Sequence, residues 1–456
     1  MTFVKIFQTF LLCCLLHLSS SAAEQKGKYR VYLVTPETDD DVYLLRRIAE
    51  NYSTEDADFW QMPQVVNESV RVLAGPGSHL PRLLETNSLQ YSLDDSDFSK
   101  TLIDSSMLFK RRAALMEGGR LKDDISVPFG ALPQAAYHSH GAISESLRRM
   151  AEASGGLAQV VDIGRSVEGR AIVGLKIGRD DGRKNVVVFD AGIHAREWAT
   201  VHTALYFINQ LLNPSPTSEV REILDRLVVY VFPVLNPDGY EYTRIDETHP
   251  KYRMWRKNRG RELCTDFNGQ RRCCKGVDLN RNFDFQFGVA GSSRYVCSEI
   301  YHGPNAFSEP ETRAVRDFFY SMRQRVRAYI TLHAYSQLFI HSFSHRTNAY
   351  PREIDDIRSA AAEAVRRLES VYGTKYRFGT GPEIIYGFGG GSTDWATQYA
   401  NVKYSYTIEL RPLYTAPNGF VMRPSELIPT ARETWRGVSA ILERVLREQP
   451  KTRGFG

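Results

Sequence analysis

The chain has 456 residues, more than one ordinary domain needs, so we expect two folded units. Its apolar fraction of 42% and charged fraction of 24% are typical of globular proteins and exclude a disordered or fibrous chain. A net charge of +5 over this length does not indicate nucleic-acid binding, because basic clusters such as residues 110–112 are short enough to be solvated.

The first 23 residues have the pattern of a secretory signal peptide. Residues 1–5 carry one positive charge, residues 6–18 are mostly apolar, and Ser21 and Ala23 suit the positions before a signal-peptidase cut. The apolar run is too short to span a bilayer comfortably, and no later stretch is longer. We therefore expect a secreted, extracellular protein with no membrane partner.

Export places the remaining cysteines in an oxidising compartment. Two cysteines lie inside the signal segment, and four remain, Cys264, Cys273, Cys274 and Cys297. An even number in one short region indicates two disulfides. Because adjacent Cys273 and Cys274 cannot easily bond each other, two pairings stay open, and a cysteine zinc site is the weaker alternative.

Residues 24–104 predict a small α+β domain. Strands are expected over 29–34, 70–73 and 89–93, and helices over 39–50 and 80–86, an order that favours a ferredoxin-like fold. Asn51 and Asn67 each begin an N-x-S acceptor sequence for glycosylation.

Residues 105–122 predict a helical linker rich in Arg, Lys and Ala. Exposed basic residues, among them Arg112, Arg120 and Lys122, are sites that a trypsin-like protease could cut. A small domain, a cleavable tether and a larger domain form the layout of a zymogen. An ordinary interdomain linker is the alternative.

Residues 123–456 alternate strands with helices and form the expected larger domain. Strands are expected over 171–177, 186–189, 227–232, 328–332 and 404–410, and helices over 198–212, 309–323, 353–372 and 429–447. Buried strands interleaved with helices indicate an α/β fold with a mixed, largely parallel sheet covered on both faces. Ligands bind beyond the carboxyl ends of strands in such sheets.

Three potential metal ligands follow two of these strands. His194 and Glu197 come directly after the strand at 186–189, and His333 comes directly after the strand at 328–332. Each histidine alone could be a hydrogen-bonded structural residue. Together, two imidazoles and one carboxylate complete a catalytic zinc set with an open position for water.

Further motifs occur in a fixed order around these residues. They include residues 190–198 (DAGIHAREW), 254–259 (MWRKNR), 276–283 (GVDLNRNF), 301–304 (YHGP), 333–337 (HAYSQ), 385–386 (IY), 390–395 (GGSTDW) and 407–411 (TIELR). In this order and spacing the chain resembles the zinc metallocarboxypeptidases of the pancreatic A/B type, secreted as procarboxypeptidases. The resemblance extends over the signal, an activation peptide and a catalytic domain.

The resemblance implies a role for each motif. His194, Glu197 and His333 bind one Zn²⁺, Glu409 is the general base and Arg256 stabilises the oxyanion. Residues Asn280, Arg281 and Tyr386 hold the terminal carboxylate of a peptide, and Arg196 and Tyr335 line neighbouring subsites. The implied disulfides are Cys274–Cys297 and, by pairing of the remaining two, Cys264–Cys273.

The resemblance is looser at the specificity pocket. The position that distinguishes A-type from B-type enzymes holds Thr393, where the family has isoleucine or aspartate. Without a carboxylate there, a Lys or Arg side chain would lose its hydration with no counter-charge. We therefore expect a preference for neutral aromatic or aliphatic C-terminal residues, with Phe388 as an apolar wall. Ser344 and Gly381 are more B-like and keep a preference for Lys and Arg open.

The implied partners are peptides or proteins with a free C-terminus, a trypsin-like activating protease and the chain's own propeptide as inhibitor. A monomer is expected. Two other functions are alternatives, a catalytically silent secreted peptide-binding protein and a two-metal aminopeptidase. The complete set of Glu409 and three metal ligands disfavours the first, and the lack of a clear second ligand set disfavours the second.

Overall fold

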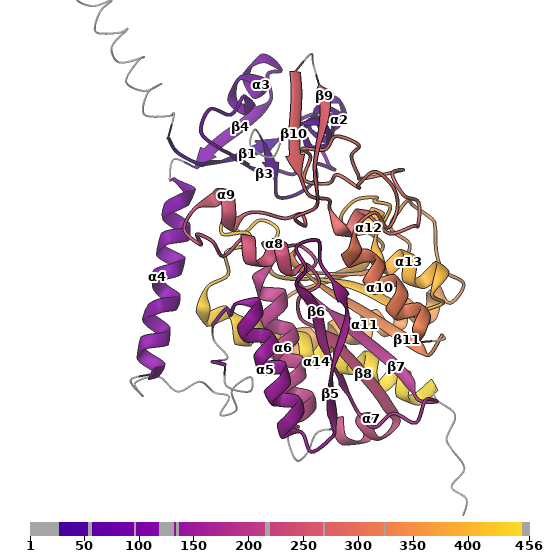
Figure 1. Cartoon of the computed structure of the whole chain (residues 1–456). Coiled ribbons are helices and arrows are strands. Elements are labelled where there is room, and N and C mark those ends of the chain that lie inside the picture. Colours follow the sequence, from indigo (N-terminus) through magenta and orange to yellow (C-terminus); the bar gives the residue numbers. More distant parts are fainter. Residues whose placement is uncertain are drawn as a thin grey trace, which may run out of the picture. The chain divides into compact units, whose positions relative to one another are not determined.

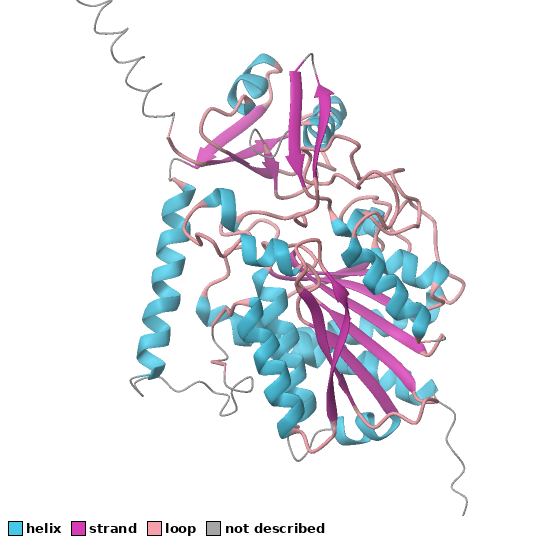
Figure 2. Cartoon of the chain, in the orientation of Figure 1, coloured by secondary structure: helices cyan, strands magenta, loops and turns pink. Residues whose placement is uncertain are grey.

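A computed structural model of the chain describes residues 27–52, 57–94, 97–117, 132–133, 136–214, 219–267, 270–322 and 324–448. The expected signal segment lies outside these ranges. The chain divides into two compact units, Met1–Ile103 and Asp104–Gly456. Figures 1 and 2 show the elements of each. The expected separation of a linker from the catalytic domain, within the second unit, stays a prediction.

The first unit is a four-stranded antiparallel sheet with two helices. Its elements are β1 (Arg30–Thr35), α2 (Asp39–Asn51), β2 (Asp58–Phe59), β3 (Val70–Ala74), α3 (Leu80–Thr86) and β4 (Gln90–Asp94). The strand order β2-β3-β1-β4 and the chain order β-α-β-β-α-β define a ferredoxin-like fold. The sequence predicted three of the four strands and missed β2, which has only two residues.

Local sequence explains the first of these helices. Thr38 accepts a hydrogen bond from the Asp41 N–H, and the Asp41 carboxylate accepts one from the Thr38 N–H, which forms a capping box. Val42, Leu45 and Ile48 recur at helical spacing and are buried in the core of this unit. A longer helix, α4 (Phe98–Glu117), starts in the first unit and ends in the second.

The second unit contains an eight-stranded sheet in the order β13-β12-β14-β11-β7-β8-β6-β5. The strands are β5 (Ala158–Arg165), β6 (Ala171–Ile177), β7 (Asn185–Asp190), β8 (Leu227–Phe232), β11 (Val326–Ser336), β12 (Leu338–His341), β13 (Arg377–Gly379) and β14 (Tyr404–Leu413). The central strands β14, β11, β7 and β8 are parallel, whereas β5, β6 and β12 join antiparallel. The predicted mixed, largely parallel sheet is confirmed.

Helices cover both faces of this sheet (Figures 1 and 2). On one face, Phe318 of α10 (Pro310–Ser321) and Trp395 of α13 (Ser392–Tyr399) pack in a cluster that includes Val188 of β7. On the other, Phe189 contacts Phe207 of α6 (Trp198–Leu212). Successive strand residues point to opposite faces, so one apolar run in β7 supplies both cores.

The remaining helices surround the sheet. They are α5 (His140–Ala153), α7 (Val220–Arg226), α8 (Pro237–Tyr242), α9 (Pro250–Arg253), the 3₁₀ turn η1 (Leu279–Arg281), α11 (Ile354–Tyr372), α12 (Gly381–Ile384) and α14 (Pro424–Glu448). Among the described residues, no helix combines the length and apolar character needed to cross a bilayer.

A disulfide-linked hairpin projects from the second unit. Strands β9 (Glu262–Phe267) and β10 (Gln270–Lys275) place Cys264 directly opposite Cys273, and these two are bonded. Because adjacent strand residues alternate sides, Cys274 faces the other way and bonds Cys297. These are the two pairs that the family resemblance implied.

Two buried carboxylates share one amide in this unit. Asn258 donates through Nδ2 to Glu309 Oε2 at 2.7 Å and to Glu311 Oε2 at 3.1 Å. Glu311 also accepts the Val167 N–H. Burial, with a smaller effect of the Glu309 charge, raises the pKa of Glu311 from 4.5 to about 7. The folded state therefore holds the Glu311 proton more tightly than the unfolded chain does.

We predict that Glu311→Gln removes a pH-dependent loss of stability. Since the folded-state pKa is raised, wild-type stability should fall as the pH rises from 4.5 to 7, by up to about 3 kcal/mol relative to the variant. Urea unfolding of the full chain at pH 5 and pH 8 measures this difference. Parallel changes in wild type and variant between the two pH values would contradict it.

Candidate functional site

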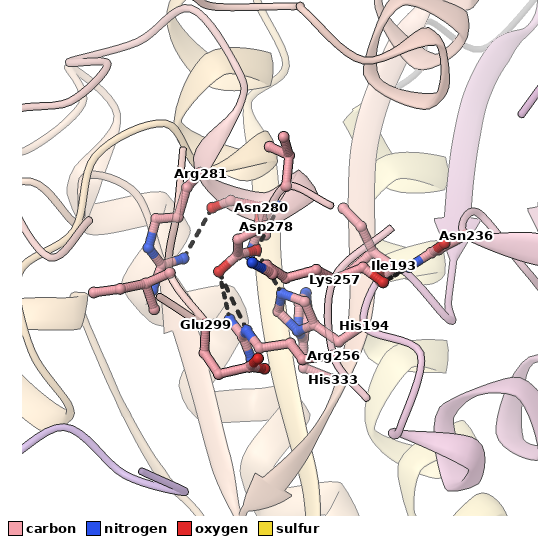
Figure 3. A network of polar contacts seen from close by, with 12 residues as sticks. Ile193, His194, Asn236, Arg256, Lys257, Asp278, Asn280, Arg281, Glu299 and His333 are labelled. Atoms are coloured by element: carbon pink, nitrogen blue, oxygen red, sulfur yellow. Dashed lines mark hydrogen bonds and ion pairs between the residues drawn. The ribbon is translucent and has the colours of Figure 1, made fainter. Parts of the chain in front are cut away.

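Three buried side chains of the second unit converge on one point that could hold a metal ion. His194, Glu197 and His333 each offer one ligand atom, and these atoms lie within 4.8 Å of one another. His194 and Glu197 come from the loop between β7 and α6. His333 lies inside β11, whereas the sequence placed it after a shorter strand. Figure 3 shows the two imidazoles side by side.

The spacing of the ligand atoms suits zinc. Four ligand atoms in a tetrahedron about 2.1 Å from zinc lie about 3.4 Å from one another. Here the His194 and His333 Nδ1 atoms are 3.1 Å apart, and they lie 2.8 Å and 3.4 Å from the nearest Glu197 oxygens. Burial raises the pKa of Glu197, but the two imidazoles outweigh it and hold that pKa well below its usual range. The carboxylate is therefore ready to bind a cation.

Asp278 connects the cluster to its surroundings. Its Oδ1 lies 3.0 Å from His194 Nε2 and accepts the Asn280 N–H, and its Oδ2 accepts two hydrogen bonds from Arg256, at 2.8 Å and 3.2 Å (Figure 3). A carboxylate at Nε2 keeps the proton on that nitrogen and turns the Nδ1 lone pair of His194 toward the metal position. Burial raises the pKa of Asp278, but Arg256 and His194 hold it well below its usual range.

Glu409 lies beside the metal cluster on the next strand. It pairs in register with His333 across the parallel strands β11 and β14, so the two side chains leave the same face of the sheet. Burial and then the charge of Glu197 raise the pKa of Glu409 to about 8. A divalent cation at the cluster would offset the Glu197 charge and lower that pKa.

Arg256 and Arg281 flank the cluster from neighbouring segments (Figure 3). Arg256 Nη1 lies 3.8 Å from Glu197 Oε1 in addition to its bonds with Asp278. Arg281 ends the turn η1 and donates from Nε to Gly291 O, from Nη1 to Asn280 O and from Nη2 to the Tyr386 hydroxyl. These bonds use three of its five N–H groups and leave one on each terminal nitrogen.

Arg196 and Tyr335 both contact Phe420. The Arg196 guanidinium lies 4.2 Å from the centre of the Phe420 ring, and the Tyr335 ring lies 4.9 Å from it, edge-on. Phe420 belongs to the irregular connection between β14 and α14. The two residues that were expected to line neighbouring subsites therefore share a third aromatic group.

The residues expected to set specificity are connected through Ser344. The Ser344 N–H donates to Asp394, the residue after Thr393, at 2.7 Å, and Ser344 O accepts the Phe388 N–H. A Cβ added to Gly381 would lie 2.9 Å from the Ser344 Cβ, so only glycine fits there without displacement. Burial raises the pKa of Asp394 to about 7. Thr393 itself brings no charge to this group.

Two residues of this site were missed from the sequence. Asp278 stands in the motif at 276–283, and a carboxylate two residues before Asn280 is a signal for a capped turn. Nothing in the sequence around Phe420 marks it, because it follows no periodic pattern.

Comparisons with known proteins match each part of the chain to a family. Residues 143–437 match the family described as zinc carboxypeptidase, and residues 32–105 match the family described as carboxypeptidase activation peptide. Carboxypeptidase B of Astacus astacus is 39% identical over 306 residues, which cover 67% of this chain and 96% of that protein. Carboxypeptidase A2 of Mus musculus is 34% identical over 424 residues, 92% of this chain and 94% of that protein.

A solved structure is similar over nearly the whole chain. The crystal structure of a carboxypeptidase A from Helicoverpa armigera superimposes with a TM-score of 0.78 at 27% identity. The match covers 94% of this chain and 99% of that one.

We predict that Asp278→Asn weakens zinc binding by roughly 10- to 100-fold, because an amide orients the His194 imidazole less well than a carboxylate does. Competition with a chelator measures the affinity. Asp180→Asn is a matched control, since Asp180 pairs with Arg325 away from the cluster. Equal zinc affinities of Asp278→Asn and wild type would refute the orienting role.

Proposed function

This chain belongs to the zinc carboxypeptidases, and we propose that it removes single neutral residues, aromatic or large aliphatic, from the C-termini of peptides. The chain is a metallocarboxypeptidase with an activation peptide, and zinc is its cofactor. The preference for neutral residues goes beyond that family assignment. It is supported by the groups around Thr393.

The observation that carries the proposed C-terminal cleavage is the hydrogen-bonding pattern of the Arg281 guanidinium. This guanidinium retains one N–H on each terminal nitrogen, which suits a carboxylate bound through two parallel hydrogen bonds. Asn280 and the Tyr386 hydroxyl stand beside it as further donors. Because Asp278 ties this turn to His194, a bound C-terminus lies at a fixed distance from the metal ligands.

We assign the chemistry to zinc, Glu409 and Arg256. Zinc, when held by His194, Glu197 and His333, supplies positive charge that polarises the scissile carbonyl and acidifies a water. Glu409 takes a proton from the attacking water and delivers it to the departing amine. Arg256, held by Asp278, donates hydrogen bonds to the oxyanion that develops on the carbonyl oxygen.

Residues upstream of the cleaved bond are assigned to Arg196, Tyr335 and Phe420. Arginine and tyrosine offer donors to the peptide backbone, and the Phe420 ring holds both side chains in place.

The preference for neutral residues rests on charge. Thr393 offers no carboxylate, and the neighbouring Asp394 already accepts the Ser344 N–H. A Lys or Arg side chain entering this region would lose hydration without a dedicated counter-charge. The alternative is a preference for Lys and Arg. It is favoured by Ser344 and Gly381, and relatives named carboxypeptidase A and carboxypeptidase B both occur among the similar proteins.

Peptides that differ only in the last residue test this proposal. We expect the activated enzyme to release Phe, Tyr and Leu faster than Lys and Arg. The same peptides with an amide in place of the C-terminal carboxylate should remain almost uncut, because Arg281 requires a carboxylate. Glu409→Gln is the matched negative control, expected to retain zinc and to lose roughly 10²- to 10⁴-fold in kcat. Faster release of Lys and Arg would establish the alternative, and rapid cleavage of amidated peptides would remove the exopeptidase assignment.

We further propose that a trypsin-like protease activates this zymogen. Of the candidates for the cut, Arg112 is half-buried on α4, where Lys110 and Arg111 beside it are exposed, and Arg120 and Lys122 lie outside the described residues. Until the cut, the activation peptide acts as an intramolecular inhibitor toward large substrates.

Incubation with trypsin should raise the activity of the full-length protein toward a large protein substrate with a free C-terminus, with N-terminal sequencing to identify the cut. Heat-inactivated trypsin is the control. Equal activity before and after cleavage would reject inhibition by the activation peptide.

We also propose that the protein is secreted as a glycosylated monomer. Two disulfides suit an oxidising compartment. Asn67 is exposed, whereas the Asn51 Nδ2 already donates to Arg47 O, so Asn67 is the better acceptor.

A further inference from the structure

An ion pair outside the metal cluster holds the short helix that precedes Tyr386. Glu383 lies in α12, three residues before Tyr386. Its Oε1 accepts hydrogen bonds from Arg358 Nη2 at 2.6 Å and from the Tyr350 hydroxyl at 2.9 Å, and its Oε2 accepts the Thr380 N–H at 2.8 Å. The Arg358 guanidinium also lies 4.7 Å from the centre of the Tyr350 ring. We call the side chains of Glu383, Arg358 and Tyr350 the Glu383 clamp.

The Glu383 clamp connects α12 to a much longer helix. Arg358 belongs to α11, which has 19 residues and buries one face, whereas α12 has four residues and is too short to be stable alone. Burial raises the pKa of Glu383, but the bonds from Thr380 and Tyr350 and the charge of Arg358 outweigh it and hold that pKa below its usual value. Glu383 is therefore a charged carboxylate at neutral pH, and its ion pair fixes where α12 lies.

Tyr386 is closely coupled to α12. The Ile385 N–H donates to Gly381 O at 2.8 Å, and a Cβ added to Gly381 would lie 2.7 Å from Tyr386 O. The Tyr386 backbone is thus packed against the first residue of α12, so the helix and the tyrosine move together. The Tyr386 hydroxyl in turn accepts a hydrogen bond from Arg281 Nη2 at 2.7 Å. A displacement of α12 would therefore move this hydroxyl relative to the Arg281 guanidinium.

A second contact holds the other end of α12. Arg377 of β13 donates from Nη2 to Ile384 O at 3.0 Å. Loss of the Glu383 clamp would leave this bond in place, so we expect α12 to shift and not to unfold. The effect on Tyr386 should accordingly be moderate in size.

We infer that Glu383 is a positioning residue for Tyr386. By tying α12 to α11, the Glu383 clamp keeps the Tyr386 hydroxyl beside Arg281, where the two groups hold the terminal carboxylate of the substrate. The inference rests on the proposed function, because it assigns a further residue to the binding of that carboxylate. Glu383 takes no part in bond cleavage.

The test measures kcat and KM of the activated holoenzyme on a hippuryl dipeptide. Glu383→Ala removes all bonds of the clamp to α12. We expect KM to rise about fivefold and kcat to stay within about twofold, because carboxylate binding is weakened while the metal ligands and Glu409 are unchanged. Glu383→Gln keeps neutral acceptors for Tyr350 and Thr380 and should recover part of the lost affinity.

Two arginine variants of α11 supply a second measurement and its control. Arg358→Met breaks the ion pair from the side of α11 and should raise KM by roughly two- to threefold. Arg366→Met is the matched control, because Arg366 pairs with Glu363 within the same helix, at 2.8 Å. It should leave both kinetic constants unchanged. Zinc content and the thermal midpoint are measured for each variant.

A double-mutant cycle separates positioning of Tyr386 from a general structural role. Tyr386→Phe lacks the hydroxyl and should itself raise KM. If Glu383 acts through that hydroxyl, Glu383→Ala should add less than about twofold to KM in the Tyr386→Phe background, because the two effects are coupled. A merely structural role would give the same increase in both backgrounds.

An unchanged KM in Glu383→Ala, or equal increases in the two backgrounds, would overturn the role of Glu383. Cleavage of amidated peptides by the wild-type enzyme as fast as of free peptides would instead overturn the proposed function. If Glu383→Ala does not fold, Arg358→Met is compared in the same two backgrounds, and equal KM increases there would refute the inference.

Discussion

The carboxylate of Asp278 holds together the parts of this site that would otherwise be independent. One oxygen meets the His194 imidazole and the backbone of Asn280, and the other takes two bonds from Arg256. Its negative charge is compensated by the partly buried Arg256 and by His194 of the metal cluster. His194 of the metal cluster, Arg256, to which we assign the oxyanion, and the turn that carries Arg281 are therefore positioned by one group. Its loss would disturb binding and chemistry together.

The parallel sheet supplies the second constraint. His333 and Glu409 are register partners on adjacent strands, and the backbone ladder between β11 and β14 fixes their separation. The loop that carries His194 and Glu197 leaves β7, the neighbour of β11 on its other side. Three adjacent strands thus deliver four functional side chains to one edge, with little freedom for any of them to move alone. This is how the fold can hold a carboxylate with a raised pKa next to the metal ligands.

Much of this architecture could be predicted from residue patterns. The bounds of β6, β8 and α6 agree with those predicted, since each is a strongly apolar or strongly periodic segment. The short strands β12 and β13 were missed, because three or four residues carry too little periodicity. His333 was placed after its strand because β11 continues past the apolar run to Ser336.

Site residues also differ in how far the sequence could reveal them. Side chains in dense motifs, such as His194 and Glu197, could be found from the sequence, and the structure brings them together. Phe420 could not be found, because it joins the site only through contacts with Arg196 and Tyr335, which lie far from it in the sequence. The two open disulfide pairings are resolved by strand alternation at Cys273 and Cys274, a feature that required knowledge of the hairpin.

That hairpin has a consequence for proteolytic damage. Cys264 and Cys273 join the two arms of the loop between them, so a single cut at any bond from residue 265 to residue 272 leaves the polypeptide in one covalent piece. The nicked molecule would migrate as an intact chain on a non-reducing gel and separate into two fragments only after reduction. A protease that cuts after the exposed Arg271 in β10 would therefore leave the chain covalently whole.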